Sequence, residues 1–218
     1  MVLNELIQFW QEDSNVNHIF KRFDEMLKIG KGIIYSSTQA IFESPSNAEE
    51  LGKQLKTEDA KINKLHQEIR RDIITHISLH GDEDILPCLL LISLIKDAER
   101  IGDYGKNIFE VWQRYPHLSD DPLKSSLKTM QENLMRWFDE TQQTFDNSDK
   151  ALAKKVRQEI YTQEKECDRI VWDLASGNQG GQAVAIALEF RFLKRVTAHL
   201  GNICSSVIMP FDKVDYHD

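Results

Sequence analysis

The chain has 218 residues and a formal net charge of −8, and 41% of its residues are hydrophobic and 28% charged. This length suffices for one large helical domain, or for two fused units, with a sizeable core. The negative charge argues against non-specific binding to nucleic acid or anionic lipid, and no apolar run approaches the roughly 20 residues that a membrane helix needs.

Apolar residues recur every three or four positions along nearly the whole chain, which is typical of amphipathic helices. A short amphipathic segment, residues 2–10, comes first; it is either a docking helix or an element exchanged between protomers. Six long helical segments follow, and their expected N-terminal caps include Ser46, Ser119 and Ser148. Breaks rich in Ser, Pro, Gly and Asn separate these segments at residues 44–46, 81–83, 115–116, 147–149 and 177–181. The sequence therefore predicts an all-α fold.

The third and sixth segments carry the same heptad pattern at a constant offset. In the third, the seam consists of Leu91, Leu94, Ala98, Ile101, Gly105, Ile108 and Trp112. In the sixth, it consists of Ile186, Glu189, Leu193, Val196, Leu200, Ile203 and Val207. The second and fifth segments also match each other, so we expect one domain, residues 1–218, built from two repeats at about 16–116 and 119–210. Each repeat is expected to form a three-helix bundle.

Glu189 is the charged exception in these seams. A carboxylate at a buried seam position needs a partner, so we expect either local hydration or a contact from Arg191 or Arg195.

The three cysteines, Cys88, Cys167 and Cys204, show no spacing typical of a metal or redox pair. An odd and sparse set is typical of reduced thiols, and the N-terminus lacks the pattern of a signal peptide. We therefore expect a cytoplasmic protein, with Cys167 as a small core residue.

Two pairs of oxygen-bearing side chains are candidates for cation binding. Glu99 and Asp103 are four residues apart, so they share one face of the third helix, on a flank beside its seam. Asp59 and Asn63 have the same spacing on the second helix, and the two pairs would converge if these helices pack antiparallel. Hard cations bind carboxylate oxygens, and an oxygen-only site would favour Mg, Mn or Fe over Zn. A solvated acidic face is the alternative interpretation of this spacing.

The string E-R-I-G-D-x-x-x-N-I, residues 99–108, resembles the signature of the PhoU family, and D-A-K-I-N, residues 59–63, is similar to its companion motif. The resemblance covers about residues 16–210, including the repeat. It implies two three-helix bundles side by side, with iron, zinc or other metals bound at acid-x-x-x-acid motifs on the outer face. It also implies negative regulation of phosphate uptake and signalling, through contacts with a phosphate transporter and a sensor kinase.

The second repeat departs from this pattern. Glu164 and Asp168 match the acid motif of the second helix, but Lys194 and Ala198 replace the two acids on the sixth. A protonated lysine donates hydrogen bonds and cannot bind a cation. We therefore expect a degenerate second site, in which Lys194 pairs with Glu164 or Asp168 instead of sharing a metal with them.

The sequence thus predicts a non-enzymatic regulatory adaptor that binds iron, manganese or zinc in its first repeat and contacts a membrane phosphate transporter, a sensor kinase or both. One alternative is a metal-free helical module that docks through its acidic flank. A carboxylate-bridged metalloenzyme is the weakest alternative, because the expected site has no histidine and no pocket that would exclude water. The sequence specifies neither the partner nor the metal. It is compatible with more than one oligomeric state, a homodimer among them.

Overall fold

The structure is a computed structural model that describes residues 14–81, 85–116, 122–177 and 180–209. Within these ranges the chain forms helices and no strand, which confirms the predicted all-α class. The helices are α2 (Ser14–Glu43), α3 (Ala48–His80), α4 (Ile85–Arg114), α5 (Lys124–Asp146), α6 (Lys150–Ser176) and α7 (Gly181–Ile208). The amphipathic segment 2–10 lies outside the described residues.

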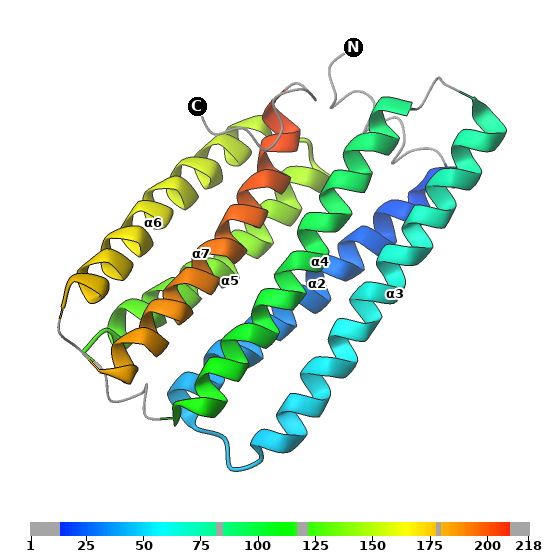
Figure 1. Ribbon diagram of the computed structural model, residues 1–218. Helices are drawn as coiled ribbons and strands as arrows, with labels where there is room; N and C mark the ends of the chain where they lie inside the picture. Colours follow the sequence, from blue (N-terminus) through cyan, green and yellow to red (C-terminus); the bar gives the residue numbers. More distant parts are fainter. Residues whose placement is uncertain (1–13, 82–84, 117–121, 178–179, 210–218) are drawn as a thin grey trace.

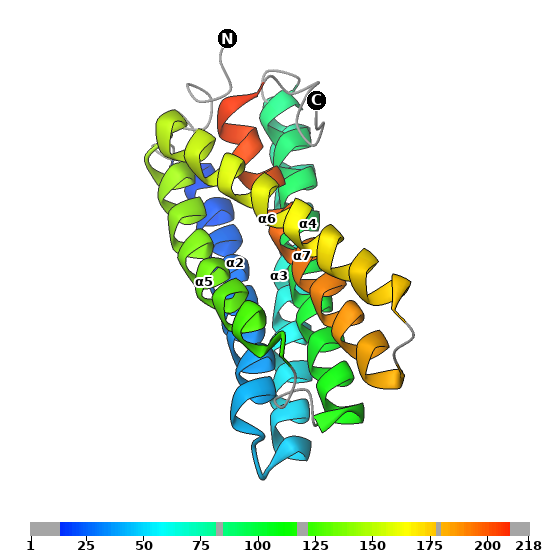
Figure 2. The same cartoon turned by 90° about the vertical axis from the view of Figure 1, so that its left-hand side faces the viewer.

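The helices form two antiparallel three-helix bundles, α2–α4 and α5–α7 (Figure 1). The last helix of each bundle packs extensively against another helix of the same bundle: α4 packs against α2, and α7 packs against α6. The bundles join mainly through α4 and α7, with a smaller contact between α2 and α5 (Figure 2). The outer helices α3 and α6 therefore lie on opposite sides of the molecule, next to α4 and α7.

Both predicted seams are buried along their whole lengths, as the heptad spacing requires. Gly105 allows a close approach within the first bundle, since a Cβ at this position would overlap Ile33 Cγ2 of α2. None of the six helices, over the residues described for them, has an apolar stretch that could cross a bilayer.

The predicted helix caps were wrong in detail. Asp149, not Ser148, caps α6, and its Oδ1 accepts hydrogen bonds from the backbone N–H groups of Ala151 and Leu152, both at 3.0 Å. Asn47, not Ser46, holds the N-cap position of α3, where no side chain caps the helix. Ser119 lies outside the described residues.

Candidate functional site

The two predicted pairs of polar side chains do converge, because α3 and α4 pack antiparallel. Asp59 of α3 and Asp103 of α4 both lie within ion-pair distance of the same ammonium group, that of Lys106. Lys106 Nζ lies 2.6 Å from Asp59 Oδ2 and 3.0 Å from Asp103 Oδ1. The predicted convergence of the acids is therefore present, and a lysine of the chain itself lies between them.

Two further side chains of this cluster also act as donors. Asn63 Nδ2 donates to Asp59 Oδ2 at 3.2 Å, as expected for residues four apart on a helix. Arg100 extends along the outside of α4, where its Nη1 lies 3.4 Å from Asp103 Oδ2 and its Nε lies 3.7 Å from Glu99 Oε2. Three carboxylates therefore face two cationic side chains.

The acids are more buried than a solvated helix flank would be. The side chain of Asp59 is only 10% exposed, and those of Glu99 and Asp103 are 21% and 33% exposed. Gly102 makes this burial feasible, because a Cβ there would lie 3.2 Å from Asp59 Oδ1 and 3.0 Å from Ile62 Cδ1. Asp59 thus packs directly against the backbone of α4.

The charges of the cluster respond to this environment. Burial raises the pKa of Glu99, and the nearby Asp103 adds to the shift. Burial disfavours the charge on Lys106, but its hydrogen bonds to Asp59 and Asp103 outweigh this effect and raise the pKa of Lys106. Lys106 is therefore a stable ammonium ion at neutral pH.

These residues, as arranged, do not fit the predicted metal. The position that bridges Asp59 and Asp103 is taken by Lys106, and Asn63 presents a donor to Asp59. In the described part of the chain, no three His, Cys, Asp or Glu side chains are grouped so that they could hold a metal ion. The iron, manganese or zinc site at Asp59, Asn63, Glu99 and Asp103 stays a prediction.

The corresponding cluster of the second bundle lies between α6 and α7. Lys194 Nζ lies 2.6 Å from both Oδ1 and Oδ2 of Asp168, so the predicted pairing of Lys194 is present, with Asp168 as its partner. Glu164 is buried, and this burial raises its pKa, opposed by the positive charges of Arg157 and Lys194. The loss of the metal site in this second bundle stays a prediction.

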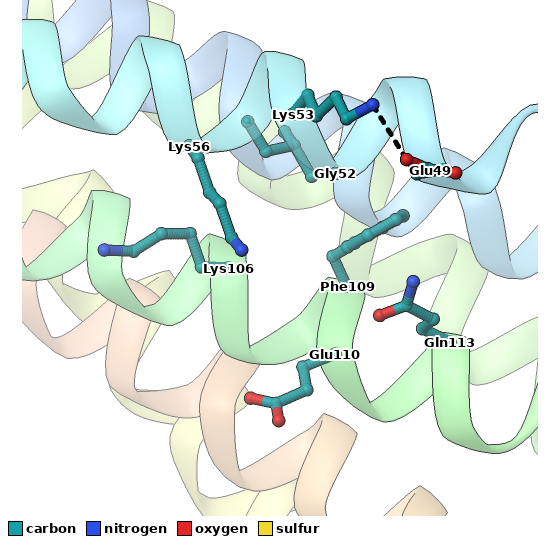
Figure 3. A pocket seen from close by; sticks show the side chains of 9 residues that line it. Glu49, Gly52, Lys53, Lys56, Lys106, Phe109, Glu110 and Gln113 are labelled. Atoms are coloured by element: carbon teal, nitrogen blue, oxygen red, sulfur yellow. Dashed lines mark ion pairs between the residues drawn. The ribbon is translucent and has the colours of Figure 1, made fainter.

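A groove of about 490 Å³ runs along α3 and α4 beside the first cluster (Figure 3). Lys56 and Lys106 lie near each other at one end, while Phe109 and Gln113 lie toward the other. Lys53 forms an ion pair with Glu49, at 2.7 Å, on the rim. Three lysines and two glutamates line this groove, so its charges nearly balance and it has no strong preference for an anion or a cation.

A second polar cluster lies where the bundles meet. His199 Nδ1 of α7 lies 2.6 Å from Asp97 Oδ1 of α4, and Asn202 Nδ2 donates to the same oxygen at 3.1 Å. Tyr104 stacks on the His199 ring, with centroids 5.7 Å apart. This cluster is largely buried and serves to hold the bundles together.

The sequence did not identify Lys106 as part of the site. The signal was present, because Lys106 follows Asp103 by three residues and so lies on the same helical face. Lys106 is one of the variable positions of the string 99–108, and its contact with Asp59 depends on how α3 packs.

Glu189 corrects another prediction. Glu189 is fully buried, and neither of its carboxylate oxygens has a hydrogen-bond partner among the described residues. Neither Arg191 nor Arg195 therefore reaches it. Burial alone raises the pKa of Glu189 well above its ordinary value, so its environment favours the neutral carboxyl over the carboxylate.

Comparison with known proteins adds three findings. Residues 11–111 match the PhoU domain family. The chain is 23% identical over 206 residues to a phosphate-specific transport system accessory protein PhoU homolog from Synechocystis sp., covering 90% of this chain and 91% of that protein. The fold resembles the crystal structure of PhoU from Pseudomonas aeruginosa, with a TM-score of 0.79 at 17% identity, covering 89% of this chain and 95% of that one.

Proposed function

We propose that this chain, which belongs to the PhoU family, regulates phosphate uptake by binding other proteins. The observation that carries this proposal is the extent of the match to the Synechocystis accessory protein, which covers about nine-tenths of both chains. The whole two-bundle unit, and not one shared motif, is therefore what the two proteins have in common. An accessory protein of a transport system acts on transporter components, so a membrane phosphate transporter is the first partner to test, and a sensor kinase the second.

The surface supports an adaptor role better than a catalytic one. The grooves on the described surface are open and lie along helix pairs, whereas catalytic sites are usually enclosed enough to exclude water. Large apolar side chains are exposed near both ends of the molecule, and such residues are common in protein contacts. They are Ile74, Leu79, Leu86 and Leu89 near the α3–α4 turn, and Trp172, Val184 and Leu188 near the α6–α7 turn.

We place this activity in the cytoplasm, on the inner side of the transporter. Support comes from the three cysteines, which are buried and free of disulfides, as expected in a reducing compartment. Burial raises the pKa of Cys167 to about 12 and that of Cys204 to about 11, so both remain unreactive thiols.

Deletion of the gene from its own host tests the regulatory role. We expect phosphate uptake at high external phosphate to rise in the deletion strain and to return to normal when the wild-type chain is restored. Unchanged uptake in the deletion strain would contradict the proposal.

The same strain locates the contact surface. Ile74→Ser and Trp172→Ser each remove one exposed apolar side chain, 64% and 70% exposed respectively, so neither should disturb folding. We expect at least one of them to fail to restore regulation and to lose co-purification with transporter components. If both restore regulation fully, the partner does not bind at these two ends.

A further inference from the structure

We infer that lysine ammonium groups take the place of metal ions in both bundles of this protein. Lys106 bridges Asp59 and Asp103 in the first, and Lys194 neutralises Asp168 in the second. The inference concerns the acid clusters alone, and it stands or falls independently of the role in phosphate uptake.

Lys106 occupies the position that a bridging cation would need. A cation that joined the two helices would have to contact Asp59 on α3 and Asp103 on α4 at once. Lys106 already does this, with N–O distances of 2.6 and 3.0 Å, which are typical of charge-assisted hydrogen bonds. A metal ion could reach the same oxygens only after the ammonium group had left.

Displacement of Lys106 by a metal ion would cost free energy. The Asp59 side chain is 10% exposed, so water can replace the lost Lys106 contact only in part. The incoming ion must also shed water of hydration, while the ammonium group is tethered to the chain and is always present. Because Lys106 is part of the same chain, its effective concentration at Asp59 and Asp103 is very high, and any metal ion must compete with it there.

The second bundle shows the same arrangement of carboxylate and lysine, with the lysine at a different position of its helix. Asp168 lies on the middle helix of its bundle and Lys194 on the last helix, as do Asp59 and Lys106 in theirs. Both oxygens of Asp168 lie 2.6 Å from Lys194 Nζ, so the ammonium group contacts both sides of the carboxylate. Lys194 follows the start of α7 by 13 residues and Lys106 the start of α4 by 21, so the two lysines are not equivalent positions.

Metal titration of the full-length chain tests this inference. The protein is dialysed against EDTA, then against metal-free buffer, and titrated with Mn²⁺ and separately with Zn²⁺. We expect wild-type protein to bind neither ion tightly at these clusters, and its thermal unfolding to be unchanged by EDTA or by either ion. The variant Lys106→Met, which keeps the aliphatic stem but removes the charge, should bind Mn²⁺ at least about tenfold more tightly than wild type.

Lys56→Met is the matched control. Lys56 is exposed in the same groove and lies one helical turn before Asp59, so this change alters the net charge equally without opening the cluster. We expect it to leave Mn²⁺ affinity unchanged. Lys194→Met tests the second bundle in the same way.

Two results would overturn the inference. The first is tight, stoichiometric binding of Mn²⁺ or Zn²⁺ by the wild-type chain that is lost in Asp59→Asn/Asp103→Asn; this would instead establish the predicted metal site. The second is a Lys106→Met variant whose Mn²⁺ affinity does not exceed that of the control. If Lys106→Met does not fold, the wild-type titration still decides between the two hypotheses.

Discussion

Glu189 is the residue whose environment departs most from its chemistry. It lies in the apolar seam of α7, and both of its oxygens lack a hydrogen-bond partner among the described residues. A buried carboxyl of this kind is tolerated in its neutral form and costs stability when the pH favours ionisation. Since its pKa is raised in the folded state, its contribution to stability is fully present below the ordinary carboxyl pKa and is lost as the pH rises through the folded value.

We therefore expect Glu189→Gln to stabilise the protein increasingly as the pH rises. The difference in unfolding free energy from wild type should grow by about 1.4 kcal/mol for each pH unit between the unfolded and folded pKa values. Urea unfolding between about pH 4 and pH 8 measures it. Glu132→Gln, at an exposed position on α5, is the control and should show no such trend. A pH-independent difference for Glu189→Gln would mean that the carboxyl finds a partner.

The site residues show which features of the site a single sequence can predict. The spacing of Glu99 with Asp103, and of Asp59 with Asn63, placed each pair on one helical face, because helix geometry is local. The choice of partner was not local, since Lys106 is 47 residues from Asp59 along the chain. Its identity depended on the register between α3 and α4, and on the absence of a side chain at Gly102.

At the scale of elements, the sequence predicted the helices well but predicted their N-terminal caps poorly. Four of the five breaks lie wholly between observed helices and the fifth overlaps α7 only at Gly181, because Pro, Gly and Asn interrupt the apolar period wherever they cluster. The cap predictions failed because Ser46 and Ser148 are no better candidates in sequence terms than their neighbours Asn47 and Asp149. Backbone conformation decided between them: Ser148 has a φ of 51° and Asp149 an extended conformation that directs its carboxylate at the helix start.

The contact between α2 and α4 leads to a prediction at this scale. Gly105→Ala would force its new methyl group into Ile33, so we expect a loss of about 1–3 kcal/mol in unfolding free energy. Gly32→Ala is the matched control, because no atom lies within 4 Å of its added Cβ, and it should stabilise α2 by up to about 1 kcal/mol. Thermal or urea unfolding measures both. Equal effects from the two changes would show that helix propensity, and not the close approach, governs Gly105.

At the scale of the whole molecule, the bundles are joined by a largely apolar contact that also contains buried hydrogen bonds, between α4 and α7 and from Gln131 of α5 to Thr38 of α2. Asp97 accepts hydrogen bonds from both His199 and Asn202 across the α4–α7 contact. Because α4 and α7 are also the core helices of their own bundles, separation of the bundles would expose both cores. The two bundles should therefore unfold together.

We expect Asp97→Ala to destabilise both bundles to the same extent. It leaves the buried donors of His199 and Asn202 without their acceptor, which costs about 1–3 kcal/mol. Hydrogen exchange followed by mass spectrometry should show equal loss of protection for the slowest amides of α3 and α6, the two outer helices. Asp173→Ala, at an exposed position, is the control. It should change the free energy of opening derived from hydrogen exchange by less than about 0.5 kcal/mol. Loss of protection confined to one bundle would show that they are separate folding units.

The sequence by itself determined the all-α class, the number and extent of the long helices, the two buried seams and the positions of the acids on their helices. All of these follow from periodicity and chain breaks, which are properties of neighbouring residues. The proposed duplication behind the two bundles also comes from the sequence, and it stays a prediction. Only the tertiary structure decided that Lys106 lies between Asp59 and Asp103, that Lys194 pairs with Asp168, and that Glu189 has no hydrogen-bond partner within the described part of the chain. These outcomes depend on the register and spacing of helices far apart in the chain, and a shift of one helical turn, about 5.4 Å, would have produced different partners.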